Sequence, residues 1–291
     1  MFTKILIATD LSAASHAVVQ CAAGLRSLGA KECLLLQCLN VRQLDAPGVA
    51  QAAGVIDQTL QDQKILLEKA GMSVQTEVVP GFAQVEINRI ARERNCSLVV
   101  VGSHGHSLLG EMLLGGVASA VIHHAVKPVL VVRVKRTPGG EVSCALGATC
   151  DFLRHVYFPT DFSPNADHAF QTVKHLVADG VRAVTLSHVQ DQARIDPHLM
   201  HRIQEFDRID RERLDKMKDA LAKAGTAKID IEIGLGRPAQ KILQDIEGKQ
   251  ATLVVMGSQG RGFVSESFLG SVSHQVARRS PAPVLLIPAK R

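Results

Sequence analysis

The feature that most constrains the fold of this chain is an internal repeat. The run Thr-Asp-Leu-Ser at 9–12 returns as Thr-Asp-Phe-Ser at 160–163, a shift of 151 residues, and each follows a short apolar run. The run LVVVG at 98–102 returns as LVVMG at 253–257, now at a shift of 155. A loop between these blocks accommodates the four-residue difference. In a chain of 291 residues the repeat predicts two domains of one fold, because single domains usually contain about 100–200 residues.

Each copy alternates short apolar runs with longer amphipathic stretches, which is the pattern of βαβ units around a parallel sheet. Runs such as LVVVG are apolar at successive positions, as expected for strands with helices on both faces. The fold class is therefore α/β, with one doubly wound parallel sheet of five strands in each copy. We expect strands at 3–9, 33–39, 73–79, 97–102 and 129–134, then at 155–159, 183–189, 228–233, 252–257 and 283–288; helices of the first copy are expected at 13–28, 50–70, 83–94 and 113–125.

The boundary between the copies falls in a segment rich in turn-forming residues. It begins with Thr-Pro-Gly-Gly at 137–140. We expect a first domain over 1–137, a linker over 138–152 and a second domain over 153–291. At the start of the second domain, Ser163 before Pro164 is typical of a helix N-cap followed by the first helical residue.

Composition excludes several classes of protein. The N-terminal segment MFTKILIATDLS has a short apolar run that we interpret as a strand and not as a signal peptide, and no run approaches the ~18 apolar residues of a membrane helix. We therefore expect a soluble cytoplasmic protein. A net charge of +5, no Trp and one Tyr make nucleic acid an unfavourable partner.

The six cysteines form no CxxC pair, and reduced thiols are the expected state. Cys144 and Cys150, both in the expected linker, are either two free thiols, which we favour, or a redox pair.

A glycine-rich loop follows the fourth strand of the second copy. Two residues separate Gly257 from Gly260, and after nine further residues Gly270 and Ser271 precede an apolar helix. Glycine where a strand ends lets the backbone approach a ligand closely, since no Cβ intervenes. The helix start presents unpaired N–H groups and the positive end of its dipole to an anion, and Ser271 adds a hydroxyl. The spacing predicts a phosphate cradle at the carboxyl end of a parallel sheet, where such folds bind ligands.

At these residues the sequence resembles the universal stress protein family, specifically its tandem-domain members. The likeness covers nearly the whole chain and also includes Leu-Ser-His-Val at 186–189 and Gly-Arg-Pro-Ala at 236–239. The resemblance implies an adenine-nucleotide alpha-hydrolase-like sheet with strand order 3-2-1-4-5. It also implies ATP, with or without Mg²⁺, bound across the ends of strands one, two and four.

The resemblance assigns individual residues of the second copy to the nucleotide. Pro159 and Asp161 would line the adenosine side with Thr160 between them, and Val189 would meet adenine through its backbone. Asp161 has an alternative role, which is to order the turn beside Ser163. The ribose and phosphates would be surrounded by Met256, Gly257, Gly260, Gly270, Ser271 and Val272, with Arg261 placed to add charge. We assign no catalytic residue.

The first copy departs from this pattern at one hydroxyl. Gly115 is followed by Gly116, where the second copy has Ser271, and Cys38 stands where the second copy has Val189. Glycine amides can still hold a phosphate, so this site is either weakened or empty. The corresponding weaker set is Thr9, Asp10, Cys38, Gly102, Gly105, Gly115 and Gly116.

Other polar clusters lack the spacing of a functional site. His104, His106, His123 and His124 have no metal-ligand spacing with a Cys or acidic partner, and we expect no metal site. His188 is expected at a strand end, where it either orients a ligand or caps the strand. The segment 207–223 is predicted to be an amphipathic helix with a solvated face.

The leading hypothesis is an ATP-binding regulatory protein of the stress response that is not an enzyme. The alternatives are a slow ATPase, a phosphoryl or adenylyl transferase, and an interaction scaffold without nucleotide. The resemblance also implies that fifth strands pair, 129–134 against 284–287, which would make the two copies an internal pseudo-dimer. A homodimer of whole chains is a further possibility.

Overall fold

The chain folds into two compact units, Met1–Cys150 and Asp151–Arg291. The computed structural model describes residues 1–39, 49–104, 114–136, 139–147, 150–195, 199–260 and 269–289, without the side chains of 49–56. Each unit is treated by itself below.

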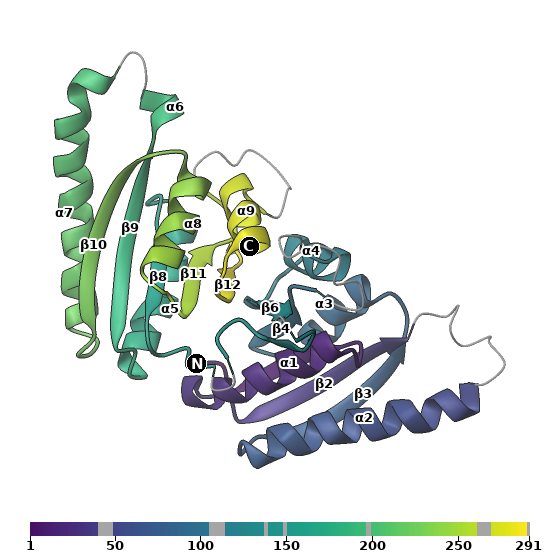
Figure 1. Ribbon diagram of the computed structural model, residues 1–291. Helices are drawn as coiled ribbons and strands as arrows, with labels where there is room; N and C mark the ends of the chain where they lie inside the picture. Colours follow the sequence, from purple (N-terminus) through teal and green to yellow (C-terminus); the bar gives the residue numbers. More distant parts are fainter. Residues whose placement is uncertain are drawn as a thin grey trace. The chain divides into compact units, whose positions relative to one another are not determined.

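The first unit contains a five-stranded parallel sheet in the order β3-β2-β1-β4-β5 (Figure 1). Its described elements are β1 (Lys4–Thr9), α1 (Ala13–Ala22), the 3₁₀ helix η1 (Ala23–Leu28), β2 (Glu32–Leu39), α2 (Val49–Lys69), β3 (Ser73–Pro80), α3 (Ala83–Glu93), β4 (Leu98–Gly102), α4 (Gly116–His123), β5 (Val129–Val132), β6 (Val134–Arg136) and β7 (Val142–Cys144).

The second unit repeats this arrangement, with strands in the order β10-β9-β8-β11-β12. Its described elements are β8 (Val156–Pro159), α5 (Pro164–Ala178), β9 (Ala183–Asp191), α6 (Gln192–Ile195), the 3₁₀ helix η3 (Met200–Arg202), α7 (Ile203–Ala222), β10 (Lys228–Gly236), α8 (Pro238–Gly248), β11 (Leu253–Gly257), α9 (Ser271–Arg279) and β12 (Val284–Ile287). Numbered within each copy, both sheets have the order 3-2-1-4-5, so the fold class is confirmed.

Connection handedness explains why helices cover both faces of each sheet. The chain moves outward from the central strand β8 through β9 to β10, then returns to the other side for β11 and β12. Right-handed crossovers place the helices of the two directions on opposite faces. Accordingly α5 contacts α7, whereas α8 contacts α9 (Figure 1). Strand residues covered from both sides are fully buried, as Val254 and Val255 are.

A buried tyrosine links β8 to the neighbouring strand and to a helix through hydrogen bonds. Tyr157, the one tyrosine of the chain, is fully buried on β8. Burial raises the pKa of its phenol well above the ordinary value, so the hydroxyl stays protonated and donates to Ser187 Oγ at 2.8 Å. A second contact, 3.2 Å to Asp245 Oδ2, ties β8 to α8. The position of β8, where the site begins, is thereby fixed.

Three boundaries differ from those predicted in the first unit. The helix expected over 13–28 is α only to Ala22 and continues as η1, which ends at Gly29 with φ 89°. The strand expected over 129–134 ends at Val132, and its continuation β6 pairs with β7. The helix expected over 113–125 is observed over Gly116–His123, and residue 113 lies outside the described residues.

The residues expected to form a linker belong partly to the first unit. Within 138–152, β7 pairs antiparallel with β6, and the hairpin packs on α1. A disulfide joins Cys150 to Cys21 of α1, 129 residues away in sequence. The expectation of reduced thiols was therefore wrong for Cys21 and Cys150, and so was the alternative pair Cys144–Cys150, whereas Cys33, Cys38, Cys96 and Cys144 are free thiols. The spacing of the cysteines along the sequence does not indicate that Cys150 pairs with a residue 129 positions earlier.

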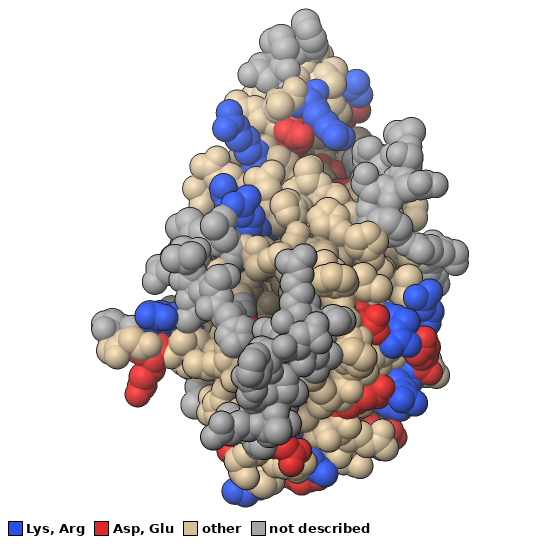
Figure 2. Space-filling model, turned by 90° about the vertical axis from the view of Figure 1, so that its right-hand side faces the viewer, with Lys and Arg blue, Asp and Glu red and all other residues tan. Residues whose placement is uncertain are grey.

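None of the helices in the described part of the chain has the length and apolarity needed to cross a membrane. Figure 2 shows one face, on which Lys and Arg are interspersed with Asp and Glu. Such mixing agrees with the modest net charge of +5.

Candidate functional site

The turn after β8 forms one wall of the candidate site. Phe162 adopts the left-handed conformation, with φ 57°, and its N–H donates to Thr160 Oγ1 at 3.0 Å. The N–H of Ser163 donates to Asp161 Oδ1 at 3.1 Å. Ser163 caps α5 by accepting from Ala166 N at 3.2 Å, which confirms the predicted N-cap and Pro164 as the first helical residue. The turn thus fixes the Asp161 carboxylate at the carboxyl end of the sheet.

The loop between β11 and α9 forms the facing wall. Gly270 N donates to Ser258 O at 2.7 Å, and Gly270 is the N-cap of α9. Ser273 Oγ donates to Gly257 O at 2.8 Å. These bonds hold the end of β11 against the first turn of α9, whose leading N–H groups have no intrahelical acceptor. The glycine spacing predicts an anion-binding site here, and these bonds bring the glycine loop and the helix start together at that position.

Asn165 locks the two walls together from below. Its Oδ1 accepts from Gln259 N at 2.8 Å, and its Nδ2 donates to Ile287 O at 3.2 Å. A Cβ on Gly257 would lie only 2.7 Å from Asn165 Oδ1, so this position admits no side chain. The sequence motif therefore contains a packing glycine at 257 as well as ligand-facing ones.

Between the walls lies a cavity of about 770 Å³ that is confined to the second unit. It gathers ten of the eleven residues predicted for the nucleotide. They are Pro159, Thr160, Asp161, Val189, Met256, Gly257, Gly260, Gly270, Ser271 and Val272. The eleventh, Arg261, lies outside the described residues.

Sequence reasoning missed the contribution of α7 to this cavity. Asp210, 8% exposed, accepts from Gln190 Nε2 at 3.0 Å, and its Oδ2 lies 3.5 Å from His188 Nε2. His188 Nδ1 donates to Thr160 O at 2.7 Å, so this histidine ties β9 to the turn after β8. The sequence offered one signal of this contribution. Asp210 directly follows the apolar Ile209, in a helix whose charged residues were predicted to face solvent.

Aromatic and cationic groups extend the same wall. The ring of Phe162 lies 4.6 Å from that of His188, and the Arg213 guanidinium lies 5.1 Å from the centre of the Phe162 ring. Arg213 and Arg194 both line the cavity. Each faces an acidic residue that also lines the cavity: Arg194 Nε lies 3.4 Å from Asp191 Oδ2, and Arg213 Nη1 lies 3.8 Å from Asp210 Oδ1.

The corresponding region of the first unit is built differently. Asp10 Oδ1 accepts from Ser12 N at 3.1 Å, from Ser12 Oγ at 2.6 Å and from Ser15 Oγ. In the second unit Ala166 replaces Ser15, so the last of these donors is absent there. Thr9 Oγ1 donates to Oε1 of the fully buried Gln63 at 2.9 Å. In the first unit the polar side chains at these strand ends therefore form hydrogen bonds with one another.

Some residues of the weaker set, in the first unit, keep the backbone geometry of the loop between β11 and α9. Gly115 N donates to Ser103 O at 2.7 Å, the same bond that Gly270 makes in the second unit, and Gly115 precedes α4, which begins at Gly116. Gly102 ends β4, and Cys38 lies on β2. Gly105 and His106 lie outside the described residues.

The fold and this cavity define a tandem α/β protein with a glycine-rich loop beside a cavity at the carboxyl end of its second sheet. The universal stress protein family model matches residues 1–133 and again 153–288, so the chain belongs to the universal stress protein family.

Relatives of this chain include both tandem and single-domain proteins. A universal stress protein of Mycolicibacterium smegmatis is 28% identical over 97% of this chain and 96% of its own length. Universal stress protein MJ0577 of Methanocaldococcus jannaschii is 29% identical over 47% of this chain and 98% of its own length. A solved universal stress protein from Archaeoglobus fulgidus is 25% identical, with a TM-score of 0.75 over 98% of both chains.

Proposed function

We propose that this protein binds ATP in its second unit and acts as a regulatory protein of the stress response. The observation that carries the proposal is the convergence of strand ends, glycine loop and helix start on one cavity of about 770 Å³. Ligand cavities for small molecules commonly have volumes of about 300–1,000 Å³. A nucleotide therefore matches both the size and the polarity of this cavity.

Each part of ATP has a suitable surface in the cavity. The amides around Gly260 and Gly270 and the hydroxyl of Ser271 suit phosphate oxygens, with the dipole of α9 directed at them. The carboxylate of Asp161 would repel phosphates and suits ribose hydroxyls, which donate to it. Val189 offers backbone groups to adenine, beside apolar Ile195 and Ile209. Mg²⁺, where present, would enter with the phosphates.

The nucleotide is held mainly in the second unit under this proposal. In the first unit the Asp10 carboxylate is engaged by Ser12 and Ser15, and Thr9 by Gln63. A ligand there would have to replace those bonds, which costs the desolvation of each group. The hydroxyl of Ser271 also has no equivalent, because Gly116 takes its place.

A regulatory role is favoured over catalysis by the residues present. Phosphoryl transfer requires a positioned base or nucleophile together with charge clamps on the transferred group. Asp161 is the acidic group beside Gly260, and its Oδ1 is held by the turn. Slow hydrolysis remains the second candidate function. The cytoplasmic location, the pairing of fifth strands and a homodimer of whole chains stay predictions.

The direct test is a calorimetric titration of the full chain with ATP. We expect about one nucleotide per chain with micromolar or tighter affinity, and adenine nucleotide in the extract of the purified protein by mass spectrometry. Gly260→Asp should abolish binding, because its side chain would clash with Asp161 Oδ2 and would add a negative charge to the loop proposed to hold the phosphates. Gly248→Asp is the matched control, since space is open around Gly248 at the end of α8. Equal ATP affinities of the two variants would show that ATP does not bind at Gly260.

Hydrolysis of labelled ATP separates regulation from catalysis. We expect turnover below about one per minute, whereas enzymes typically reach about 10 per second. Faster turnover that Gly260→Asp abolishes would assign the chain to the ATPases. If no nucleotide binds, the result would favour the third hypothesis, an interaction scaffold without nucleotide.

A further inference from the structure

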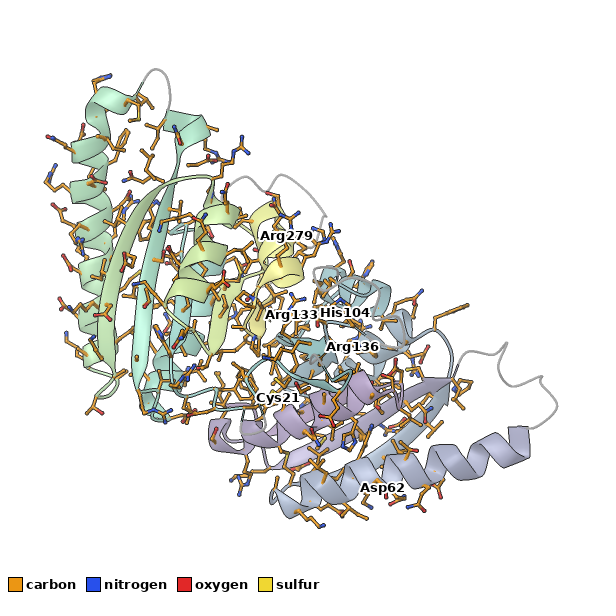
Figure 3. The ribbon with its side chains drawn as sticks, viewed as in Figure 1. Cys21, Asp62, His104, Arg133, Arg136 and Arg279 are labelled. Carbon is orange, nitrogen blue, oxygen red and sulfur yellow. A yellow bond between two sulfur atoms is a disulfide. The ribbon has the colours of Figure 1, made fainter. Side chains whose placement is uncertain are left out.

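Three cysteines meet in the first unit, whereas the candidate nucleotide cavity belongs to the second. They are Cys21 on α1, Cys144 at the end of β7 and Cys150, and each is at most 4% exposed. Their sulfur atoms all lie within 4.8 Å of one another. Cys144 Sγ lies 3.0 Å from Cys21 Sγ, while Cys21 is joined to Cys150 by the disulfide. Figure 3 labels Cys21 on α1.

The hairpin of β6 and β7 and the turn that follows it place Cys144 and Cys150 beside Cys21 of α1. Cys144 pairs with Val134 in the hairpin, and Ala145 N donates to Arg133 O at 2.8 Å. The chain then turns at Gly147, φ 77°, whose N–H donates to Cys144 O at 3.0 Å. Cys150 itself adopts φ 36°, a region that non-glycine residues rarely occupy. The backbone is thus bent to bring Cys150 back beside Cys144.

We propose that, in the reduced protein, Cys21, Cys144 and Cys150 bind one thiophilic d¹⁰ metal ion, with Cu⁺ preferred over Zn²⁺. Thiolate ligands select ions of this class. Metal–sulfur bonds of about 2.3 Å separate the sulfurs of a three-coordinate centre by about 4.0 Å. Cys144 Sγ and Cys21 Sγ are now 3.0 Å apart and reach that spacing with a shift of about 1 Å, and all three sulfurs already lie within 4.8 Å of one another, so the cluster requires local adjustment only.

The number of ligands decides between the two ions. Structural Zn²⁺ is almost always four-coordinate, whereas this cluster offers three sulfurs. A water as fourth ligand is disfavoured, because all three cysteines are buried. Among the described residues, this group of three His, Cys, Asp or Glu is the one whose ligand atoms converge closely enough for a metal. Cu⁺ is satisfied by three thiolates.

Binding requires reduction of the disulfide first. A dithiol supplies two electrons and two protons, the Cys21–Cys150 bond breaks into two thiols, and the dithiol becomes a disulfide. The metal then displaces one proton from each of the three thiols. Oxidation to the disulfide removes two ligands at once, so occupancy depends on the redox state of the compartment.

The test is a metal titration of the full chain, reduced with a dithiol and desalted anaerobically. Cu⁺ and Zn²⁺ are titrated separately against chromophoric chelators. We expect one Cu⁺ per chain, and a loss of affinity of about 100-fold or more in Cys144→Ala. Cys96→Ala is the matched control, because Cys96 is fully buried and lies outside the cluster. A control variant that loses Cu⁺ equally, or wild-type protein that binds no Cu⁺, overturns the proposal.

A second measurement does not depend on any variant folding. The X-ray absorption spectrum of wild-type protein loaded with Cu⁺ should show three sulfur neighbours at about 2.3 Å. A shell containing nitrogen or oxygen, or only two sulfurs, would contradict the three-thiolate site. Binding of Zn²⁺ without Cu⁺ would contradict the assigned ion. Neither outcome affects the ATP site, which lies in the second unit.

Discussion

The carboxylate of Asp161 lies directly over Gly260, where a Cβ on that glycine would stand 2.6 Å from Asp161 Oδ2. The two residues come from opposite walls of the cavity, since Asp161 follows β8 and Gly260 follows β11. The other carboxylate oxygen is fixed by Ser163 N at 3.1 Å. A side chain at position 260 would therefore have to displace the Asp161 carboxylate or the loop itself.

This contact predicts that Gly260→Ala weakens ATP binding by about tenfold or more, which corresponds to about 1.4 kcal/mol. The added methyl group displaces either the carboxylate or the loop, so the melting temperature should also fall. Asp161→Ala should lower the melting temperature less in Gly260→Ala than in the wild-type protein, because it removes the clash as well as the bond from Ser163 N, and it should not restore the ATP affinity. Gly248→Ala serves as the control in calorimetry and thermal melts. Additive effects on stability would show that the two residues do not interact.

Asn165 provides a test of loop preorganisation. Asn165→Ala removes the bonds to Gln259 N and Ile287 O and should lower ATP affinity by about tenfold, because the loop must then be ordered on binding. Asn88→Ala is matched, since the buried Asn88 Nδ2 donates to Val121 O at 3.1 Å in the first unit. Each variant should lose about 1–3 kcal/mol in urea unfolding. Equal ATP affinities for the two would refute the ordering role.

The hydroxyl at the start of α9 distinguishes the two copies and can be exchanged between them. Ser271→Gly should weaken ATP binding by about tenfold or more, because hydrogen bonds to charged groups contribute about 1.5–3 kcal/mol. Gly116→Ser supplies the hydroxyl to the first unit, where no atom lies within 4 Å of the added Cβ. Titration should still give about one nucleotide per chain, since Gln63 and Ser15 keep the first site engaged. Two nucleotides per chain would show that the hydroxyl alone disables it.

The repeat predicted most of the fold, and the glycine spacing together with the family resemblance predicted ten of the residues that line the cavity. They succeed because strand ends and helix starts are encoded locally, as at Gly257 and Ser163. The Asp210–His188–Gln190 network was not predicted, because it joins α7 to β9 and depends on which helix face turns inward. The Cys21–Cys150 disulfide was missed for a related reason. It depends on a hairpin folding back onto α1, and nothing in the sequence between these cysteines, which are 129 positions apart, signals that contact.

Asp210 is expected to stabilise the cavity wall. Asp210→Ala leaves Gln190 Nε2 and His188 Nε2 without the carboxylate that they face at 3.0 and 3.5 Å. We expect a loss of about 2–3 kcal/mol in the free energy of unfolding, because buried groups that lose a charged partner retain their desolvation cost. Asp207→Ala is the control, since exposed Asp207 accepts from the same Gln190 amide at 3.1 Å and should change stability by about 0.5 kcal/mol or less. Urea unfolding measures both. Equal losses would mean that burial of Asp210 adds nothing to its bond with Gln190, and that α7 is held to β9 by its apolar contacts alone.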